Sequence, residues 1–258
     1  MNMKFIERFF PKDHISLPDE KLQISVGGGF DSAGKEFLNH FISIGKLKPF
    51  ETVLDVGCGC GRMSLPLTTY LNNKGRYYGF DIVKESVAWC QQNISKKYPN
   101  FNFKHADIYN KEYNKNGKIS SRDFIFPYDD DSFDFIFLTS VFTHMLPEDM
   151  EHYFSEISRT LKNGGRCLIS FFLLNEESRL LMKEKPQKLK FEFGQEIFQT
   201  IDADVPEKAI SYDEKYIKQV YSKNKIRIEY PIHYGFWCSR ETHLSYQDII
   251  IGVKDNSR

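Results

Sequence analysis

Short apolar runs alternate along this chain with longer segments in which apolar residues recur every three or four positions. The short runs predict buried strands at 52–56, 76–81, 101–107, 133–140 and 166–174. The periodic segments predict helices at 36–47, 63–71 and 84–98, and a fourth that begins at Pro147 and stops at Asn163-Gly164-Gly165. Strands that alternate with helices in this way indicate a parallel sheet with helices on both faces, a three-layer α/β sandwich.

The pattern is less regular at both ends of this region. Residues 1–35 read as irregular, and residues 175–211 break the alternation, which suggests an inserted lid. A helix at 212–223 and two closing strands at 226–234 and 247–253 complete the chain. We therefore expect one domain over residues 1–258, with a mostly parallel sheet of seven strands and an antiparallel C-terminal hairpin.

Charge and composition narrow the classes of function. Thirty-five basic and 35 acidic residues give no net charge, which argues against a nucleic-acid-binding surface. The chain shows neither a signal peptide nor a run of about 18 apolar residues, so we expect no membrane span. Five cysteines without a C-x-x-C pair suggest a cytoplasmic protein, and the acidic run 129–131 reads as a solvated turn rather than a metal site.

The strongest local signal is Asp55-Val56-Gly57-Cys58-Gly59-Cys60-Gly61-Arg62, which lies between a predicted strand and a predicted helix. Glycines allow a tight turn there and let a ligand approach the backbone closely. The dinucleotide pattern G-x-G-x-x-G fails, because Arg62 or Ser64 stands where its last glycine would be. An acidic residue precedes the first glycine by two positions instead.

This D-x-G-x-G-x-G segment resembles motif I of the class I S-adenosylmethionine-dependent methyltransferases, whose fold is Rossmann-like. The resemblance implies S-adenosylmethionine as cofactor, with Asp55 and the glycines beside its methionine and ribose parts. Asp81 ends the second predicted strand, where a carboxylate can accept both ribose hydroxyls. Asp107 ends the third, where the family contacts adenine. The predicted cofactor-binding residues are Asp55, Gly57, Cys58, Gly59, Gly61, Asp81, Ile82, Asp107, Ile108 and Thr139.

Three further segments are similar to a bacterial subgroup of sugar, glycan and natural-product O-methyltransferases. They read V-G-G-G-F, S-V-F-T-H-M-L-P and S-Y-Q-D-I. The resemblance implies a small-molecule acceptor, such as a hydroxyl of a sugar, a phosphorylated metabolite or a capsule precursor. We also expect the N-terminal segment, residues 1–35, to cover the cofactor, with Gly27–Phe30 folding over it as a flexible segment beside a closing site can. N-methylation of a small molecule or a protein stays open, as does a homo-oligomer.

An alcohol acceptor needs proton removal, which suits a histidine with a pKa near neutrality. His144 follows the fourth predicted strand, at the sheet edge where ligands bind, and is our candidate base; a helix cap or a packed side chain is the alternative. Tyr128, His233, Tyr234 and Arg240 are candidate substrate contacts. Two other functions stay open, an NAD-dependent oxidoreductase and a non-catalytic binding protein. The glycine spacing argues against the first, and the three strand-end acids argue against the second.

Overall fold

The computed structural model describes residues 15–255. The first part of the predicted covering segment, residues 1–14, lies outside the described residues. The chain forms two compact units. The N-terminal unit contains the described residues up to Asp107 together with Phe133–Phe135, and the C-terminal unit contains Ile108–Ser132 and the described residues from Ile136 onward.

A seven-stranded sheet with the strand order β10-β11-β5-β4-β1-β2-β3 forms the framework. The pairs β1–β2 and β2–β3 are parallel, whereas β11 is antiparallel to both β5 and β10. This confirms the predicted α/β Rossmann-like fold with its antiparallel C-terminal pair. The strands are β1 (Thr52–Val56), β2 (Arg76–Asp81), β3 (Phe101–His105), β4 (Phe133–Leu138), β5 (Leu161–Phe171), β10 (Ile226–His233) and β11 (Asp248–Lys254).

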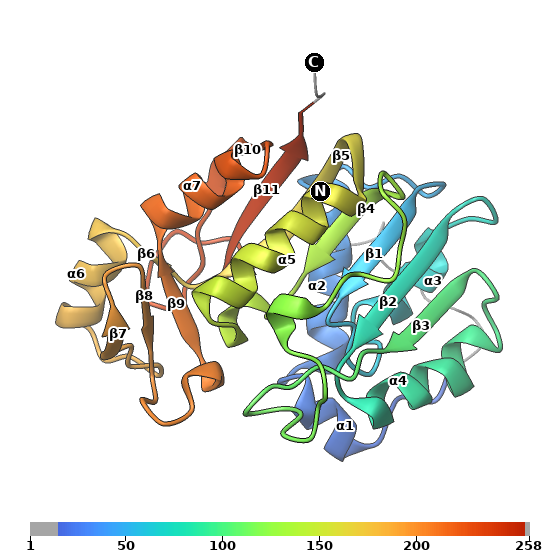
Figure 1. The fold of residues 1–258 in the computed structure, drawn as a ribbon, viewed down its shortest axis with the longest axis horizontal. Helices are drawn as coiled ribbons and strands as arrows, with labels where there is room; N and C mark the ends of the chain where they lie inside the picture. Colours follow the sequence, from blue (N-terminus) through green and yellow to red (C-terminus); the bar gives the residue numbers. More distant parts are fainter. Residues whose placement is uncertain (1–14, 256–258) are drawn as a thin grey trace. The chain divides into compact units, whose positions relative to one another are not determined.

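In the N-terminal unit, β1, β2 and β3 lie side by side (Figure 1). Its helices are α1 (Glu20–Ser25), α2 (Phe30–Ser43), α3 (Ser64–Tyr70) and α4 (Lys84–Cys90), which continues as a π-helical turn over Gln91–Ser95. The expectation of irregular structure up to residue 35 was wrong where α1 and the start of α2 lie. Two short signals were missed: Asp19 caps α1 by accepting from Leu22 N, and Gly29 precedes α2 with a left-handed φ of 68°.

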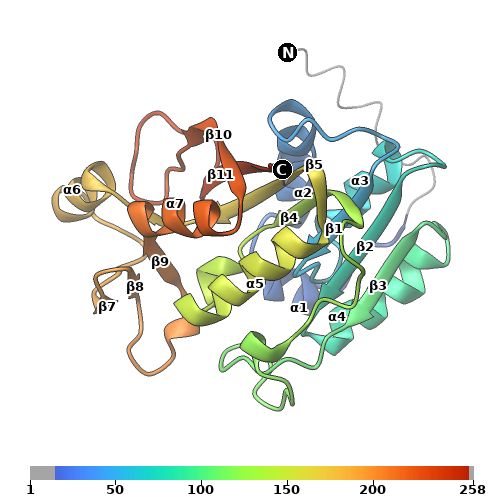
Figure 2. The same cartoon turned by 45° about the horizontal axis from the view of Figure 1, so that its top comes forward.

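The C-terminal unit contains the helices α5 (Pro147–Thr160), α6 (Glu176–Glu184) and α7 (Glu214–Lys223). The helices α5 and α7 run side by side (Figure 2). The rings of Phe154 and Tyr221, one from each helix, pack edge to face. A second sheet has the order β6-β9-β8-β7, with β6 (Leu173–Leu174), β7 (Phe193–Gln195), β8 (Phe198–Thr200) and β9 (Ile210–Asp213). The segment predicted as a lid, 175–211, thus supplies most of this sheet together with α6; its action as a lid stays a prediction.

The predicted end of α5 at Asn163-Gly164-Gly165 was wrong. The helix ends at Thr160, and β5 begins at once with the fully buried Leu161. The backbone N–H groups of Asp131 and Ser132 donate to the carbonyls of Arg159 and Thr160, at 3.0 and 2.8 Å. A turn distant in sequence therefore satisfies the last carbonyls of the helix, and no glycine cap is needed.

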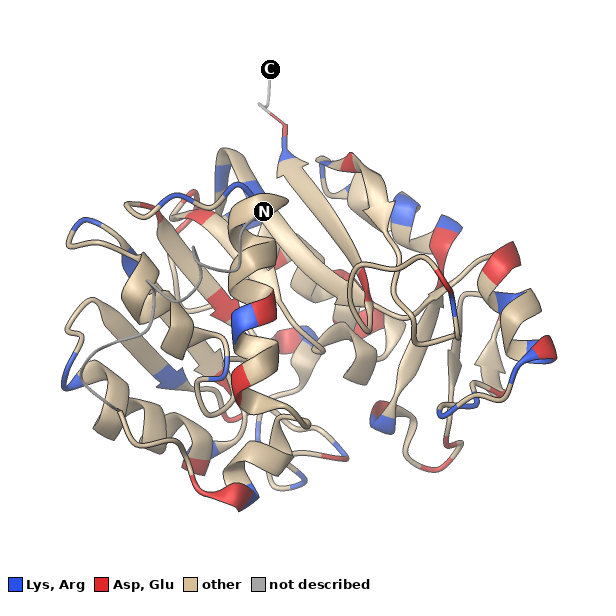
Figure 3. Ribbon diagram, turned by 180° about the vertical axis from the view of Figure 1, so that it is seen from behind, with Lys and Arg blue, Asp and Glu red and all other residues tan. Residues whose placement is uncertain are grey.

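The acidic run 129–131 is used in ion pairs. Asp130 pairs with Arg159 at 2.8 Å, and Asp131 pairs with Lys254 at 2.8 Å. Figure 3 shows Lys and Arg interspersed with Asp and Glu over the elements of both units. Within residues 15–255, no helix is long and apolar enough to cross a membrane.

Candidate functional site

The glycine loop is tied to the end of the neighbouring strand. The N–H groups of Gly57 and Cys58 both donate to the carbonyl of Phe80 in β2, at 2.9 and 3.0 Å. Gly57, Gly59 and Gly61 all have positive φ, at 81°, 50° and 88°. Residues other than glycine rarely adopt a positive φ, so the backbone of this turn requires glycine at all three positions.

Asp81, at the end of β2, holds this loop in place. Its Oδ2 accepts from Gly59 N at 2.7 Å, and its Oδ1 accepts from Val83 N at 2.8 Å. Burial raises the pKa of Asp81, and the hydrogen bonds from Val83 and Gly59 oppose that rise. Each carboxylate oxygen keeps further accepting capacity after its one backbone bond. A bidentate contact with two hydroxyl groups is therefore compatible with the observed geometry.

The carboxyl group of Asp55 is fully buried, and only one of its two oxygens has a hydrogen-bond partner among the described residues. Its exposed fraction is zero, Tyr77 donates its hydroxyl to Oδ2 at 2.6 Å, and Oδ1 has no partner among the described residues. Burial is the largest effect on this carboxyl and raises its pKa to about 8. A buried acceptor without a donor is costly in isolation. It fits the cationic methionine end of S-adenosylmethionine, which would supply the missing positive charge.

The N-terminal segment packs against the same loop. Cys60 Sγ donates to the carbonyl of Leu22 at 3.3 Å, and a Cβ built on Gly59 would lie only 2.5 Å from Val26 Cγ1. A Cβ on Gly27, which has a φ of 88°, would lie 3.4 Å from Arg62 Nη1. The described part of the predicted covering segment thus contacts the glycine loop directly.

The other predicted cofactor residues divide between the two units. In the N-terminal unit, Ala106 N donates to the carbonyl of Asp81 at 2.9 Å, which ties the chain just before Asp107 to the end of β2. Ile82 lies in the same unit, and its carbonyl contacts the ring of His105 at 3.2 Å. Ile108 and Thr139 are buried in the C-terminal unit. The structure thus brings Asp55, the glycines, Asp81 and Asp107 together around the ends of β1, β2 and β3.

His144 lies in a short 3₁₀ turn, Phe142–His144, after β4. Its Nδ1 is 2.7 Å from the carbonyl oxygen of Glu207. A carbonyl can only accept, so Nδ1 carries a proton, and the neutral ring has its lone pair on Nε2. Burial lowers the pKa of His144, and the hydrogen bond to Glu207 opposes that effect. In the neutral ring, Nε2 is therefore the nitrogen that can accept a hydrogen bond or a proton.

Two residues between β3 and β4 contact His144. The hydroxyl of Tyr113 lies 3.4 Å from Nε2, and its ring meets the imidazole edge to face at 5.1 Å. Asn110 Nδ2 donates to the carbonyl of His144 at 3.3 Å. The sequence analysis missed both residues, because nothing local marks a loop residue as the neighbour of a histidine about 30 positions away.

The four predicted substrate-contact residues, Tyr128, His233, Tyr234 and Arg240, lie in different parts of the C-terminal unit. The carbonyl of Tyr128 accepts from Arg159 Nη1 at 2.9 Å. Tyr234 and Arg240 are brought together, with the guanidinium 4.5 Å from the centre of the Tyr234 ring. His233 ends β10. Contact of these four residues with a substrate stays a prediction.

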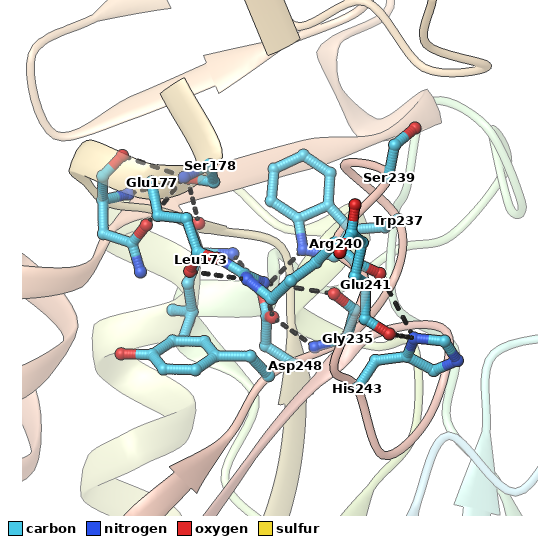
Figure 4. Close-up of polar contacts among 12 residues, drawn as sticks. Leu173, Glu177, Ser178, Gly235, Trp237, Ser239, Arg240, Glu241, His243 and Asp248 are labelled. Atoms are coloured by element: carbon cyan, nitrogen blue, oxygen red, sulfur yellow. Dashed lines mark hydrogen bonds and ion pairs between the residues drawn. The ribbon is translucent and has the colours of Figure 1, made fainter. Parts of the chain in front are cut away.

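Arg240 belongs to a buried polar cluster centred on Asp248 (Figure 4). The Asp248 carboxylate accepts from Gly235 N, Leu173 N and Trp237 Nε1, each at 2.7 Å, and from Arg240 Nη1 at 3.2 Å. Arg240 Nε also donates to Glu177 at 2.8 Å. Burial is the main cause that raises the pKa of Asp248 to about 6. These bonds fix the loop 235–240 against the start of β6 and against α6.

Comparison with known proteins identifies the family. The model of a family described as "Methyltransferase domain" matches residues 47–226. A tRNA N(3)-cytidine methyltransferase from Gallus gallus is 31% identical over 119 residues, which cover 45% of this chain and 29% of that protein. A phosphoethanolamine N-methyltransferase from Caenorhabditis elegans is 26% identical over 146 residues, covering 56% and 28%. The chain thus spans less than a third of the length of these two relatives.

Solved structures share the fold at low identity. The PH0226 protein from Pyrococcus horikoshii OT3 superposes with a TM-score of 0.62 at 15% identity, over 92% of this chain and 96% of that one. The predicted fold is thereby confirmed. The sequence expectation of an O-methyltransferase subgroup is not decided by these similarities, since both relatives described above are N-methyltransferases by name.

Proposed function

This chain belongs to the methyltransferase-domain family, and from that premise we propose that it transfers the methyl group of S-adenosylmethionine to a hydroxyl of a small molecule. The observation that supports a hydroxyl acceptor is the fixed tautomer of His144, whose Nδ1–H donates to the Glu207 carbonyl. An alcohol must lose a proton during methyl transfer, whereas a neutral amine can attack without a base. A neutral imidazole with an oriented lone pair is the group that an alcohol acceptor requires.

In this proposal the N-terminal unit holds the cofactor. The partnerless oxygen of Asp55 faces the cationic methionine end, the Asp81 carboxylate accepts from the ribose hydroxyls, and Asp107 contacts the adenine. The glycine loop allows close approach, because none of its three glycines has a Cβ. The segment that contains Leu22 and Val26 already packs against this loop and is suited to exclude water from it. When bound, S-adenosylmethionine supplies an activated methyl group, so this chain needs to supply only orientation, dehydration and proton removal.

His144 removes the proton in the proposed reaction. Nε2 accepts it from the acceptor hydroxyl, and the Glu207 carbonyl stabilises the resulting imidazolium through Nδ1–H. The Tyr113 hydroxyl, 3.4 Å from Nε2, is a weak contact that an acceptor hydroxyl would replace. The turn of His144 follows the carboxyl end of β4, and ligands in open sheets of this kind bind beyond the carboxyl ends of strands.

For the acceptor we propose a hydroxyl of a sugar, a phosphorylated metabolite or a capsule precursor. The absence of net charge supports a small molecule over a nucleic acid. A second candidate is N-methylation of a small phosphorylated amine, which is favoured by the similarity to phosphoethanolamine N-methyltransferases from Caenorhabditis elegans and Triticum aestivum. The two candidates differ in their need for a base, so they differ in their sensitivity to loss of His144.

The first experiment is calorimetric titration of the protein with S-adenosylhomocysteine, with NAD as the control ligand. We expect one-to-one binding of S-adenosylhomocysteine alone, and loss of affinity in Asp81→Ala. Glu85→Gln, an exposed substitution in α4 of the same unit, is the matched control and should bind normally. Binding of NAD in preference would remove the proposed function altogether.

The second experiment identifies the acceptor. Radiolabelled S-adenosylmethionine is incubated with sugars, sugar phosphates, phosphoethanolamine and other small amines, and methylated products are separated by mass spectrometry. The best acceptor is then tested with His144→Gln. A large loss of turnover supports O-methylation, whereas an amine product formed at the normal rate by His144→Gln would support the second candidate.

A further inference from the structure

Ser140, just after β4, has a backbone conformation that serine rarely adopts. Its φ is 61°, in the left-handed region that favours glycine. Such a conformation persists only where surrounding contacts enforce it. Ser140 lies four residues before His144, so its backbone angles set the direction in which the turn of His144 leaves the sheet.

A network of three side chains enforces this conformation within the C-terminal unit. Ser140 N donates to Ser170 Oγ at 2.8 Å, and Ser170 Oγ donates to Gln247 Oε1 at 2.6 Å. Ser140 Oγ donates to the same Gln247 oxygen at 3.1 Å. Ser170 lies in β5 and is fully buried, and Gln247 immediately precedes β11. β5 and the residue just before β11 thus both contact Ser140, and we call Ser170 and Gln247 the Ser140 clamp.

The clamp is itself rigidly anchored. Gln247 is followed by Asp248, whose carboxylate binds Gly235, Leu173, Trp237 and Arg240 in the buried cluster of Figure 4. Asp248 and Phe171 are partners in the β11–β5 pairing. Because four hydrogen bonds hold the Asp248 side chain, the neighbouring Gln247 has little freedom to move away from Ser140.

The conformation of Ser140 is transmitted to His144 through one short turn. His144 N donates to the carbonyl of Val141 at 2.9 Å, and Met145 N donates to that of Phe142 at 3.3 Å. Tyr212 donates its hydroxyl to the carbonyl of Met145, which fixes the far end of the turn. The clamp thus holds one end of the turn and Tyr212 holds the other.

We infer that Gln247 and Ser170 are positioning residues for His144: they hold Ser140 in its left-handed conformation and so keep the imidazole against the Glu207 carbonyl. The inference rests on the proposed function only in treating His144 as the base. It gives a physical role to the S-Y-Q-D-I segment, in which Gln247 serves the turn after β4 and Asp248 serves the loop 235–240.

The test follows the imidazole directly, by NMR titration of His144 in the full chain. Its surroundings are the Glu207 carbonyl, the backbone of Lys208, the Glu112 carboxylate and the Tyr113 ring. In Gln247→Leu or Ser170→Ala, we expect the turn to loosen and the imidazole to become more hydrated. Its titration midpoint should then rise toward the ordinary value of about 6.5.

Two further variants keep the result interpretable. Ser140→Gly added to Gln247→Leu should return the midpoint toward that of the unmodified protein, because glycine adopts a positive φ without enforcement. Gln187→Leu is the matched control. Its amide donates to the carbonyls of Leu181, Lys185 and Cys238, so its loss should leave the His144 midpoint unchanged.

An unchanged His144 midpoint in folded Gln247→Leu and Ser170→Ala would overturn the inference, even if both variants were less stable. If Gln247→Leu does not fold, Ser170→Ala alone decides. The titration needs neither cofactor nor acceptor. Normal methyl transfer by His144→Gln would therefore refute the role of the base without affecting the clamp, and the two failures can be told apart.

Discussion

Replacement of Asp55 by asparagine tests the electrostatics of the glycine-loop site. The Asp55 carboxyl is fully buried, with one hydrogen bond from Tyr77 at 2.6 Å. Burial raises its pKa from 3.8 to about 8; the proximity of Asp81 adds to the rise, while Tyr77 and Arg62 oppose it. Asparagine has the same shape and can accept the same hydrogen bond, but it cannot ionise. The substitution therefore removes the titration and little else.

The magnitude follows from proton linkage. Between the two pKa values the folded chain holds a proton on Asp55 that the unfolded chain has lost. The contribution of this group to stability is therefore complete below about pH 4 and is lost as the pH rises toward 8. The loss is about 1.4 kcal/mol per pH unit. Relative to Asp55→Asn, the unmodified protein should lose about 3 kcal/mol of unfolding free energy between pH 5 and pH 7.

The assay is urea denaturation of both proteins at several pH values, in the absence of cofactor. The measured quantity is the difference in unfolding free energy between them, so that titrations elsewhere, such as that of Asp248, cancel. Glu85→Gln, which removes an exposed carboxyl in the same unit, is measured beside them as the control variant.

Parallel stability curves for Asp55→Asn and the unmodified protein would refute the reasoning, because they would mean that Asp55 titrates alike in the folded and unfolded chains. A second consequence can be checked in the same samples. A cationic ligand beside the carboxyl favours its ionised form, so S-adenosylmethionine should bind more tightly as the pH rises toward 8. Asp55→Asn should lose this dependence.

Three further predictions concern single residues of the two units. Asp81→Ala should weaken S-adenosylhomocysteine binding by roughly 1–3 kcal/mol, measured by calorimetry, because the carboxylate accepts from Gly59 N and, in our proposal, from the ribose hydroxyls. Unchanged affinity would remove Asp81 from the site. Gly59→Ala should lower the unfolding free energy by at least ~1 kcal/mol, measured by denaturant titration, because Gly59 has a φ of 50° and an added Cβ would lie 2.5 Å from Val26. An unchanged unfolding free energy would contradict this packing. His144→Gln should reduce turnover about 10²–10⁴-fold with cofactor affinity retained. In the unmodified enzyme, turnover should rise with pH and level off at a lower pH than an ordinary imidazole base would give, because burial lowers the pKa of His144; a rise centred at a higher pH would show that another group is the base.

The glycine loop shows how much of the site can be predicted from local sequence. Asp55, the three glycines and Asp81 lie within 27 residues of one another, at the ends of two adjacent parallel strands. Their spacing reflects a turn whose geometry is local, so the pattern specifies both conformation and neighbours. The predicted strands and most helices were recovered for the same reason, since hydrophobic periodicity records which face of each element is buried.

Contacts between distant segments could not be predicted in this way. The end of α5 was misplaced because the N–H groups of Asp131 and Ser132 cap it, and no property of residues 161–165 reveals that partner. The segment 175–211 was separated from the alternating pattern, but its pairing into a second sheet depends on β6 and β9 at its two ends.

The sequence by itself determined the fold class, the family and the glycine loop, because each depends on residues that are neighbours along the chain or recur with the period of one element. Only the tertiary structure decided the chemical state of the site. The tautomer of His144 is set by Glu207, 63 positions away, and Ser140 is held by Gln247, 107 positions away. Hydrogen-bond direction and burial depend on which atoms meet in three dimensions, and it is these contacts that raise the pKa of Asp55 and leave Nε2 of His144 as the accepting nitrogen.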